Sequence, residues 1–342
     1  MVSVFITTSV FTPSTGGGNV SSHEYNALKR VDDSTLYLSI EHIYPPKYNL
    51  PDNPFLYDYM AVVKLIEKRV PLHILKIAFF NGSPFGLTTH FIKSWSLVRT
   101  VADCPAHVIE ESVKEFNNLG MQYPFAHMID PYLFSLYIKH IVYADAIVTP
   151  SNYSANYIEK KFNVKRDKIK VIPHGTDIPP YMPQYDFNQF IALHVGQNGP
   201  DKGQIYFIKA LKKLGDKVKG ILVGHGTEYW SGYGLGRVSN VEEYYKKCSV
   251  YVQPSVTEGF GIPVLEAMAH GRPVIVSNGA GVSEIVEDGV DGFVVPARDV
   301  NAIVDRIQYF IDHREEIENM GKRAYYKAKK YSWTIIEKQY ES

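Results

Sequence analysis

The stretch TEGFGIPVLEAMAHGRPVIV, Thr257–Val276, carries the strongest signal in this 342-residue sequence. It places two glutamates, Glu258 and Glu266, eight positions apart with two glycines and a proline between them. A carboxylate accepts hydrogen bonds from hydroxyl groups, often two at once. The stretch therefore predicts hydroxyl-binding groups on both sides of a turn whose glycines let a ligand approach the backbone.

The segments around the turn indicate what lies between the two glutamates. A strand is predicted at Val250–Gln253 and a helix at Val264–His270, with Pro263 suited to the first helical turn. The residues 259–261 then precede a helix N-terminus at the carboxyl end of a strand, where open α/β sheets bind ligands. Glycine backbone and a helix N-terminus favour a phosphate. A diphosphate flanked by two polyols is a nucleotide sugar.

Composition narrows the class of protein. Hydrophobic residues make up 45% and charged residues 21%, and the net charge is +0, which argues against a general nucleic-acid binder. The two cysteines, Cys104 and Cys248, fit reduced thiols in a reducing compartment. The start, MVSVFITTSVF, is typical of a first strand rather than of a signal peptide. We expect a cytoplasmic protein and leave peripheral contact with a membrane open.

Strand-like and helix-like segments alternate along most of the chain, which predicts parallel sheets with crossover helices. Apolar residues at Ile205, Ile208, Leu211 and Leu214 give one face to a helix after Asp201. Further helices are expected after Val300 and in the final YSWTIIEKQY segment. The expected strands are Val2–Thr8, Thr35–Ile40, Ala146–Thr149, Lys170–Ile172, Ile191–Val195, Gly220–Val223, Val250–Gln253 and Pro273–Val276.

A proline-rich segment divides the chain into two halves. Pro173, Pro179, Pro180 and Pro183 would interrupt regular helix or central strand, so we expect a linker at Ile172–Asp186. The predicted domains are 1–175, which would bind the acceptor, and 176–325, which would bind the nucleotide sugar. Residues 326–342 are expected to form a helix that packs back on the N-terminal domain.

Residues His194–Pro296 resemble the nucleotide-sugar domain of GT-B glycosyltransferases of the retaining family-four type (glycosyl transferases group 1). That family carries an E-x7-E element with EGFG at its start and EAMA-x-G-x-P-V at its end, here Glu258–Gly261 and Glu266–Val274. PHGTD, HVGQNGPDKG and LVGHG precede it in the family's order. The N-terminal half resembles the family mainly through TPSTGGGNVSSHEY and its alternation of strands and helices.

The resemblance implies an α/β protein of two Rossmann-like domains that face each other across a cleft. It also implies transfer of a hexose from a nucleoside diphosphate sugar to a hydroxyl acceptor with retention of configuration. Glu258 would contact the donor sugar near its reacting carbon, Glu266 the ribose, and Lys202 the diphosphate. The other expected donor-binding residues are Gly16, Gly17, Gly196, Gln197, Val238, Gly259, Phe260 and Gly261.

Lys202 also makes physical sense without the resemblance. A lysine in the first turn of a helix opposes the helix dipole, and a bound diphosphate would reverse that effect. Its charge would stabilise the leaving group as the sugar–phosphate bond breaks. No Asp-x-Asp triplet, the usual metal cradle of the other major transferase fold, occurs in the sequence. A metal-independent reaction without a cofactor is therefore expected.

The sequence departs from the family at several positions. Gln197 stands where the family usually has an arginine, and Arg237 or Arg272 could compensate; His174 replaces the asparagine of the P-N-G-V-D element. The family also tends to place a histidine near the reacting sugar. Candidates for that place are His90, His107, or Glu110 and Glu111 after a strand at Ala106–Ile109.

Several alternatives stay open from the sequence alone. The segment THFIKSWSLVRTVA, Thr89–Ala102, suits either a membrane-surface helix or core packing. A non-catalytic nucleotide-sugar-binding or scaffold protein and a nucleotide-sugar epimerase fit the same fold, whereas an oxidoreductase is disfavoured because no G-x-G-x-x-G follows the first strand. UDP-sugars are the first expectation and GDP-sugars the second. The acceptor could be a glycan, a lipid, a protein or a small molecule.

Overall fold

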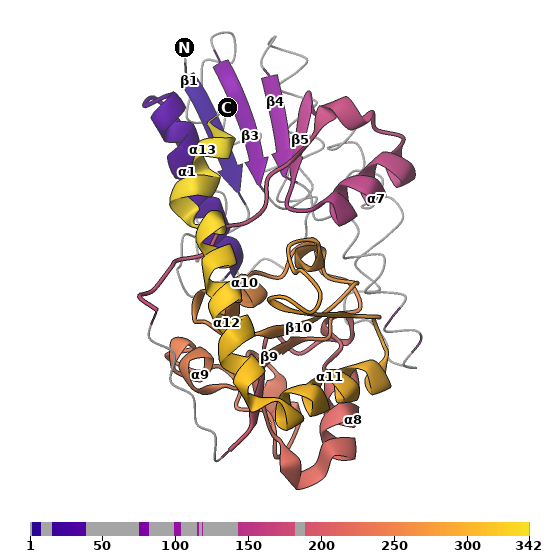
Figure 1. The fold of residues 1–342 in the computed structure, drawn as a ribbon. Helices are drawn as coiled ribbons and strands as arrows, with labels where there is room; N and C mark the ends of the chain where they lie inside the picture. Colours follow the sequence, from indigo (N-terminus) through magenta and orange to yellow (C-terminus); the bar gives the residue numbers. More distant parts are fainter. Residues whose placement is uncertain are drawn as a thin grey trace, which may run out of the picture. The chain divides into compact units, whose positions relative to one another are not determined.

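The computed structural model describes residues 2–7, 16–38, 75–81, 99–103, 115, 118, 143–181 and 189–341. The chain divides into two compact units (Figure 1). The first unit comprises Met1–Ala106, Gln122–Ile172 and Ile336–Ser342, and the second comprises His107–Met121 and Pro173–Ile335.

The first unit contains, within its described residues, a six-stranded parallel sheet with the order β2-β1-β3-β4-β5-β6. Helix α7 begins where Ser151 accepts a hydrogen bond from Ser154 N–H at 3.1 Å, a side-chain N-cap. The strands are β1 Val2–Thr7, β2 Leu36–Leu38, β3 Leu75–Asn81, β4 Arg99–Asp103, β5 Ala146–Thr149 and β6 Ile169–Val171, and the helices are α1 Gly16–Val31, α7 Asn152–Phe162 and the short turn η2 Arg166–Lys168.

Strands β3 and β4 were not among the expected strands. Residues 99–102 close the THFIKSWSLVRTVA segment, and they pair with β3 and β5. A membrane-surface helix is therefore wrong for that end of the segment, because these residues form a strand inside the sheet. The remaining predictions for this region lie outside the described residues: Cys104, Ala106–Ile109, His107, Glu110, Glu111, and His90 with the rest of the segment.

The second unit contains, in its described part, a five-stranded parallel sheet with the order β11-β10-β9-β7-β8. The strands are β7 Ile191–Val195, β8 Lys219–Val223, β9 Val250–Gln253, β10 Val274–Ser277 and β11 Gly292–Val295. The helices are α8 Gln204–Leu214, α9 Glu242–Lys247, α10 Ile262–Ala269, α11 Val300–Asp312 and α12 Arg314–Ala328, and α13 Trp333–Tyr340 begins in this unit and continues into the first. Short turns are η3 Pro200–Lys202, η4 Gly215–Lys217, η5 Thr227–Tyr229, η6 Gly281–Glu284 and η7 Lys329–Tyr331.

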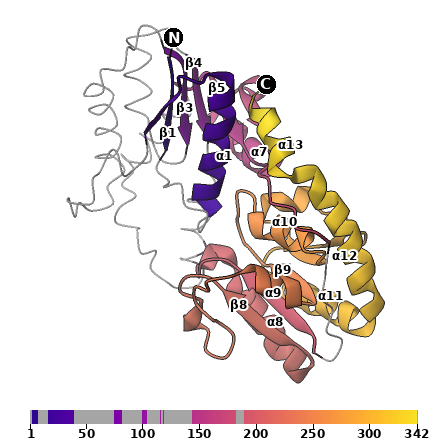
Figure 2. The ribbon, with the colours of Figure 1, turned by 90° about the vertical axis from the view of Figure 1, so that its left-hand side faces the viewer.

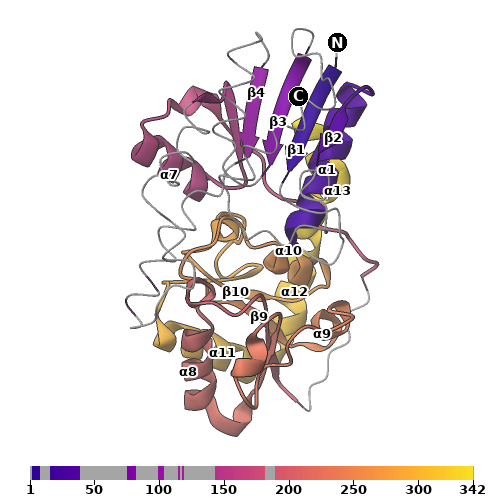
Figure 3. The same cartoon turned by 180° about the vertical axis from the view of Figure 1, so that it is seen from behind.

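Helices cover both faces of the second sheet because its strands are apolar on both sides. Val250 and Val252 on β9 pack with α8 and α11, which lie side by side (Figures 1 and 3). Tyr251, between them, joins the opposite cluster with α10 and the end of α12. Such two-sided burial is the rule for parallel sheets. Loops join the strands to these helices at both ends of the sheet, and those at the carboxyl ends of β7 and β9 carry Lys202 and Glu258.

The last helix, α13, ends in the first unit. Within that unit, Glu337 contacts His23 on α1 and accepts from Arg30 Nη2 at 2.6 Å. Figure 2 shows the ribbons of α1 and α13 from the side. Arg30 also contacts Glu341. Among the described residues, no helix is both long and apolar enough to cross a membrane.

Candidate functional site

The loop after β9 carries Glu258 and is fixed to the loop after β10. Glu258 N–H donates to Gly279 O at 2.9 Å, and Gly281 N–H donates to Glu258 O at 3.0 Å. Val282 N–H donates to Phe260 O at 2.8 Å. These bonds continue the parallel pairing of β9 and β10 beyond their carboxyl ends. The backbone around Glu258 is therefore held by the sheet.

Gly261 ends this loop in a conformation that disfavours a side chain. Its φ is +110°, and a Cβ atom there would meet Val282 Cγ1 at 3.1 Å. Helix α10 begins directly after it, with Pro263 in the first turn. Within the described part of the chain, no hydrogen bond takes up the N–H groups of Phe260 and Gly261. Together with the helix dipole, these amides suit an anion.

Lys202 forms an ion pair with Glu258. Its Nζ contacts Glu258 Oε2 and lies 3.7 Å from Asp201 Oδ2. Burial lowers the pKa of Lys202, but the two carboxylates outweigh burial and leave that pKa raised. The ammonium therefore stays protonated. Burial raises the pKa of Asp201, and Lys202 opposes that change.

The turn that carries Lys202 packs against the loop that carries Glu258 and is hydrogen bonded to it. Lys202 ends the short turn η3, and α8 begins two residues later, so it does not lie in the first turn of α8 as expected. Gly203 has a φ of +67°, and a Cβ atom there would lie 2.1 Å from Pro254 O. Asp201 O accepts from Val256 N–H at 2.7 Å. The conformation of one turn thus depends on the other.

Gln204 holds the glycine turn that follows β7. Its Nε2 donates to Gln197 O at 2.8 Å, and its Oε1 accepts from Gly199 N–H at 3.3 Å. Gln204 Nε2 also lies 3.2 Å from His194 Nε2, while His194 Nδ1 lies 3.0 Å from Val252 O. Burial lowers the pKa of His194 to about 4. A neutral imidazole protonated on Nδ1 fits both contacts.

The same turn packs backbone to backbone against the turn after β8. Gly196 N–H donates to Val223 O, and Asn198 N–H donates to His225 O, both at 2.8 Å. Gly224 has a φ of +141°, and a Cβ atom there would lie 2.1 Å from Gly196 O. Close approach therefore requires glycine at this position.

The two arginines proposed to compensate for Gln197, Arg237 and Arg272, differ in their exposure to solvent. The Gln197 and Arg237 side chains are exposed. Arg272 is completely buried; its Nε donates to Tyr245 O at 2.8 Å and its Nη2 contacts Lys246 O. The expectation that Arg272 compensates at the phosphate is wrong, because its guanidinium holds the end of α9.

Glu266 lies on α10 and is held by a buried tyrosine. Tyr245 on α9 is 1% exposed, and its hydroxyl donates to Glu266 Oε2 at 2.7 Å. The His270 ring stacks on Tyr245 with centroids 5.3 Å apart, and its Nδ1 lies 2.8 Å from Glu266 O. Burial raises the pKa of Glu266, while the Tyr245 hydrogen bond opposes the rise. A fixed carboxylate of this kind can accept hydrogen bonds from a diol.

His174, the departure from the family's asparagine, touches the Glu258 loop. Its ring meets Phe260 edge-on, with centroids 5.2 Å apart and an interplanar angle of 79°. Phe260 is 3% exposed. Burial lowers the pKa of His174 to about 4. The start of the second unit therefore supports the loop through a neutral ring.

The expected site residues fall into three groups. Lys202 and Glu258 are in direct contact, and the buried residues Gly259, Phe260 and Gly261 join them to the helix that carries Glu266. Gly196 and Gln197 form the adjoining turn, and Val238 packs against the core beside α9 and α10. Gly16 and Gly17 are the first two residues of α1 and belong to the first unit.

Sequence reasoning missed Asp201, Gln204 and Tyr245. Gln204 carried a signal, because a glutamine opens the apolar helix that follows the Lys-Gly pair. Tyr245 carried none, since its partner Glu266 lies 21 residues away. Among the described residues, no group of three or more His, Cys, Asp or Glu side chains is arranged to hold a metal ion.

Comparison with known proteins identifies the class. The family model described as Glycosyltransferase Family 4 matches residues 10–178, and the one described as Glycosyl transferases group 1 matches residues 181–327. With two parallel α/β units, these matches define a GT-B glycosyltransferase and confirm the predicted fold. The chain belongs to the group 1 glycosyltransferases.

Individual relatives agree with this placement. Uncharacterized glycosyltransferase MJ1178 of Methanocaldococcus jannaschii is 30% identical over 202 residues, which is 56% of each chain. The chain thus spans little more than half of that relative's length. The N,N'-diacetylbacillosaminyl-diphospho-undecaprenol alpha-1,3-N-acetylgalactosaminyltransferase of Campylobacter jejuni is 24% identical over 317 residues, 84% of this chain and 81% of the relative.

Solved structures share the fold at lower identity. Sucrose-phosphate synthase from Thermosynechococcus elongatus has a TM-score of 0.79 at 17% identity, covering 99% of this chain and 97% of that one. Anabaena Alr3699/HepE in complex with UDP and glucose has a TM-score of 0.73 at 17% identity, covering 98% and 97%.

Proposed function

We propose that this chain transfers a hexose from a nucleoside diphosphate sugar to a hydroxyl acceptor, with retention of anomeric configuration and without a metal ion or other cofactor. The observation that carries the proposal is the Lys202–Glu258 ion pair beside the N-terminus of α10. It puts a protonated amine, a carboxylate and helix amides at one edge of the sheet. These are the groups that a sugar diphosphate needs.

The first step is exchange of partners when the donor binds. The diphosphate competes with Glu258 for the Lys202 ammonium, since both are anionic. Glu258 then accepts hydrogen bonds from the sugar hydroxyls, and Lys202 stabilises the charge that grows on the leaving diphosphate. Departure of that group on the face that the acceptor attacks would give retention, as the family resemblance implies.

Glu266 is assigned to the ribose. Its carboxylate is fixed by Tyr245 at 2.7 Å and can accept from both ribose hydroxyls. We expect UDP as the preferred nucleotide and GDP as the second. The complex of Anabaena HepE with UDP supports UDP only by analogy of fold. The acceptor supplies a hydroxyl group and is a glycan, a lipid, a protein or a small molecule.

A non-catalytic nucleotide-sugar-binding protein is the second candidate. Gln197 contributes no charge, and Arg272 is committed to α9, so Lys202 is the cation that the described site offers next to Glu258. Weaker phosphate binding would follow. Binding of a nucleotide sugar without transfer to a broad acceptor panel would favour this candidate, and sugar interconversion without acceptor would indicate an epimerase.

The test begins with calorimetric titration of the chain with UDP, GDP and ADP, in parallel with Lys202→Ala. We expect a preference for UDP and weaker binding in the variant. The selected nucleotide then defines the sugars for a transfer assay with the parent and Glu258→Gln. Equal transfer rates in the parent, Glu258→Gln and Lys202→Ala would contradict the assigned roles.

A further inference from the structure

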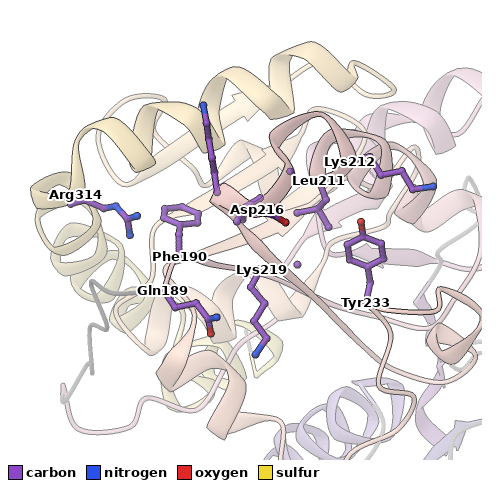
Figure 4. A pocket seen from close by; sticks show the side chains of 12 residues that line it. Gln189, Phe190, Leu211, Lys212, Asp216, Lys219, Tyr233 and Arg314 are labelled. Carbon is purple, nitrogen blue, oxygen red and sulfur yellow. The ribbon is translucent and has the colours of Figure 1, made fainter.

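The two ends of strand β7 lie in different surroundings. Its amino end, with that of β8, borders an open pocket of about 610 Å³, in which the side chains of Lys212, Lys219 and Arg314 point in different directions (Figure 4). Near its carboxyl end lie two buried polar side chains, His194 on β7 and Gln204 at the start of α8, which are 0% and 1% exposed. Buried polar groups of this kind need hydrogen-bond partners.

The contacts of this pair fix both side chains in one orientation. His194 Nδ1 lies 3.0 Å from Val252 O, so it carries the proton and leaves Nε2 as an acceptor. Gln204 Nε2 then donates one hydrogen to His194 Nε2 at 3.2 Å and the other to Gln197 O at 2.8 Å. A flipped amide would turn Gln204 Oε1 toward two acceptors, the imidazole nitrogen and the carbonyl oxygen. One assignment therefore makes every bond.

Through these bonds Gln204 holds the backbone turn at residues 196–199. Its Oε1 accepts from Gly199 N–H at 3.3 Å, while its Nε2 holds Gln197 O. Of the four N–H groups of this turn, all within the described part of the chain, three are hydrogen bonded and that of Gln197 is not. A turn fixed through its other peptide groups presents this amide to an anion without further ordering.

The same side chain holds the turn that carries Lys202. Gly199 O accepts from Lys202 N–H at 3.0 Å, so the residue that Gln204 fixes is also the residue that precedes η3. The Gln204 side chain thus closes the segment 199–204 on itself. Lys202 lies inside this closed segment, and its ammonium contacts Glu258. Loss of the Gln204 amide would loosen the free amide of the first turn and the backbone of Lys202 together.

We propose that Gln204 is a positioning residue for the donor diphosphate, with His194 as the group that orients its amide. Gln204 holds the Gln197 N–H and the Lys202 turn in the arrangement that meets the diphosphate. The inference rests on the proposed function, because it takes a diphosphate as the ligand of Lys202. It concerns the phosphates alone, so binding of the nucleoside part does not depend on Gln204.

The test compares nucleotides with nucleosides on the full chain. Ligand-observed NMR titration measures the affinities of UDP, GDP, uridine and guanosine for the parent and for Gln204→Met, which keeps the length of the side chain but loses the amide. The nucleotide that the parent prefers should bind the variant about tenfold more weakly, and its nucleoside should bind both proteins alike. Gln308→Met, the same change on α11, is the matched control and should bind like the parent.

The outcomes separate the two hypotheses. A parent that binds neither UDP nor GDP would contradict the donor site itself. Parent-like nucleotide binding in a folded Gln204→Met, or an equal loss for nucleotide and nucleoside, would overturn the positioning role alone. Thermal unfolding checks that the variant is folded. If it is not, His194→Phe carries the same comparison, with an expected loss of about threefold for the nucleotide and none for the nucleoside.

Nitrogen NMR of the histidine rings tests the orientation of the pair. The parent at pH 7 should show His194 protonated on Nδ1 and bare on Nε2. Gln204→Glu replaces the donor with a carboxylate, which only accepts, so it should bring a proton onto His194 Nε2 and raise the pKa of that imidazole. A filling role for Gln204 would not move this signal. A proton on Nε2 in the parent, or an unchanged ring in Gln204→Glu, would overturn the assigned contact.

Discussion

The two glutamates of the E-x7-E element lie in the loop after β9 and on the helix α10 that follows it, and their surroundings differ. Glu258 contacts a charged partner, the Lys202 ammonium. Glu266 accepts from a neutral partner, the buried Tyr245 hydroxyl, and burial raises its pKa. The same residue type in one motif is therefore prepared for two tasks. A carboxylate balanced by a cation suits exchange with a diphosphate, and one fixed by a phenol suits hydroxyl groups.

The largest effect is expected from breaking the ion pair between Lys202 and Glu258. Lys202→Ala removes the cation that meets the diphosphate, and loss of one such group typically lowers kcat roughly 10²–10³-fold. The measurement is sugar transfer from the nucleotide sugar that calorimetry selects. Lys247→Ala, which breaks an exposed pair with Glu243 at 3.6 Å, is the control and should keep the parent rate. A Lys202→Ala rate equal to the control would remove Lys202 from the reaction.

The next largest effect is expected at Glu266, the glutamate whose partner is the neutral Tyr245 hydroxyl. Glu266→Gln keeps an acceptor for Tyr245 but loses the charge, so UDP should bind about tenfold more weakly. The parent should also prefer UDP to 2′-deoxy-UDP, and the variant should lose most of that preference. Calorimetry with both nucleotides measures the ratio. An unchanged ratio would mean that Glu266 does not contact the ribose.

The same variant should be more stable than the parent at neutral pH. The folded pKa of Glu266 is raised above the ordinary 4.5, so the folded state holds its proton more tightly than the unfolded chain. The free energy of unfolding therefore falls as pH rises from 4.5 through the folded pKa. Glu266→Gln removes that loss. Urea unfolding of both proteins should show a gain at pH 7 that disappears toward pH 4.5; a loss of stability at pH 7 would contradict it.

A smaller effect is expected from Tyr245→Phe. It leaves Glu266 in place but removes its neutral donor, which should cost about 1 kcal/mol of unfolding free energy and weaken UDP binding severalfold. Tyr244→Phe, one residue away on α9, is the matched control. The two measurements are urea unfolding and UDP titration. If both variants behave alike, the Tyr245 hydroxyl does not position Glu266.

The smallest effect concerns the linker that touches the Glu258 loop. Because the pKa of His174 is lowered to about 4, the unfolded chain takes up a proton first as pH falls below the ordinary 6.5. Stability is therefore lost between pH 6.5 and about 4. Asparagine cannot titrate, so His174→Asn should lose less, although His194 still contributes. Unfolding at pH 7.5 and pH 5 measures the slope; equal slopes would contradict the shift.

Local patterns predicted the second unit well. The glycines and prolines around EGFG and EAMA predicted β9, the turn and α10. Signals for a strand, a turn and a helix follow each other there within one short stretch. The predicted helix after Asp201 is observed as α8. Lys202 was predicted in the first turn of that helix, but it lies in the preceding short turn η3. Gly203 adopts a positive φ and separates the two, which no apolar spacing indicates.

Contacts between segments far apart in the sequence could not be predicted from local patterns. The strand β3 lies in the run LHILKIAFFN, whose mainly apolar residues do not separate a strand from a helix by their spacing. Arg272 looked available for phosphate, but its position against α9 depends on tertiary packing. The pairing of Tyr245 with Glu266 joins two helices and is likewise invisible to local patterns.

The contact between the Lys202 turn and the Glu258 loop has a consequence for redesign. Asp201 O holds Val256 N–H at 2.7 Å, and Gly203 fits against Pro254 only because it lacks a side chain. A loop transplanted from a homologue on one side alone would meet a partner of the wrong shape. Exchange of specificity by grafting should therefore move 199–204 and 254–261 as a matched pair.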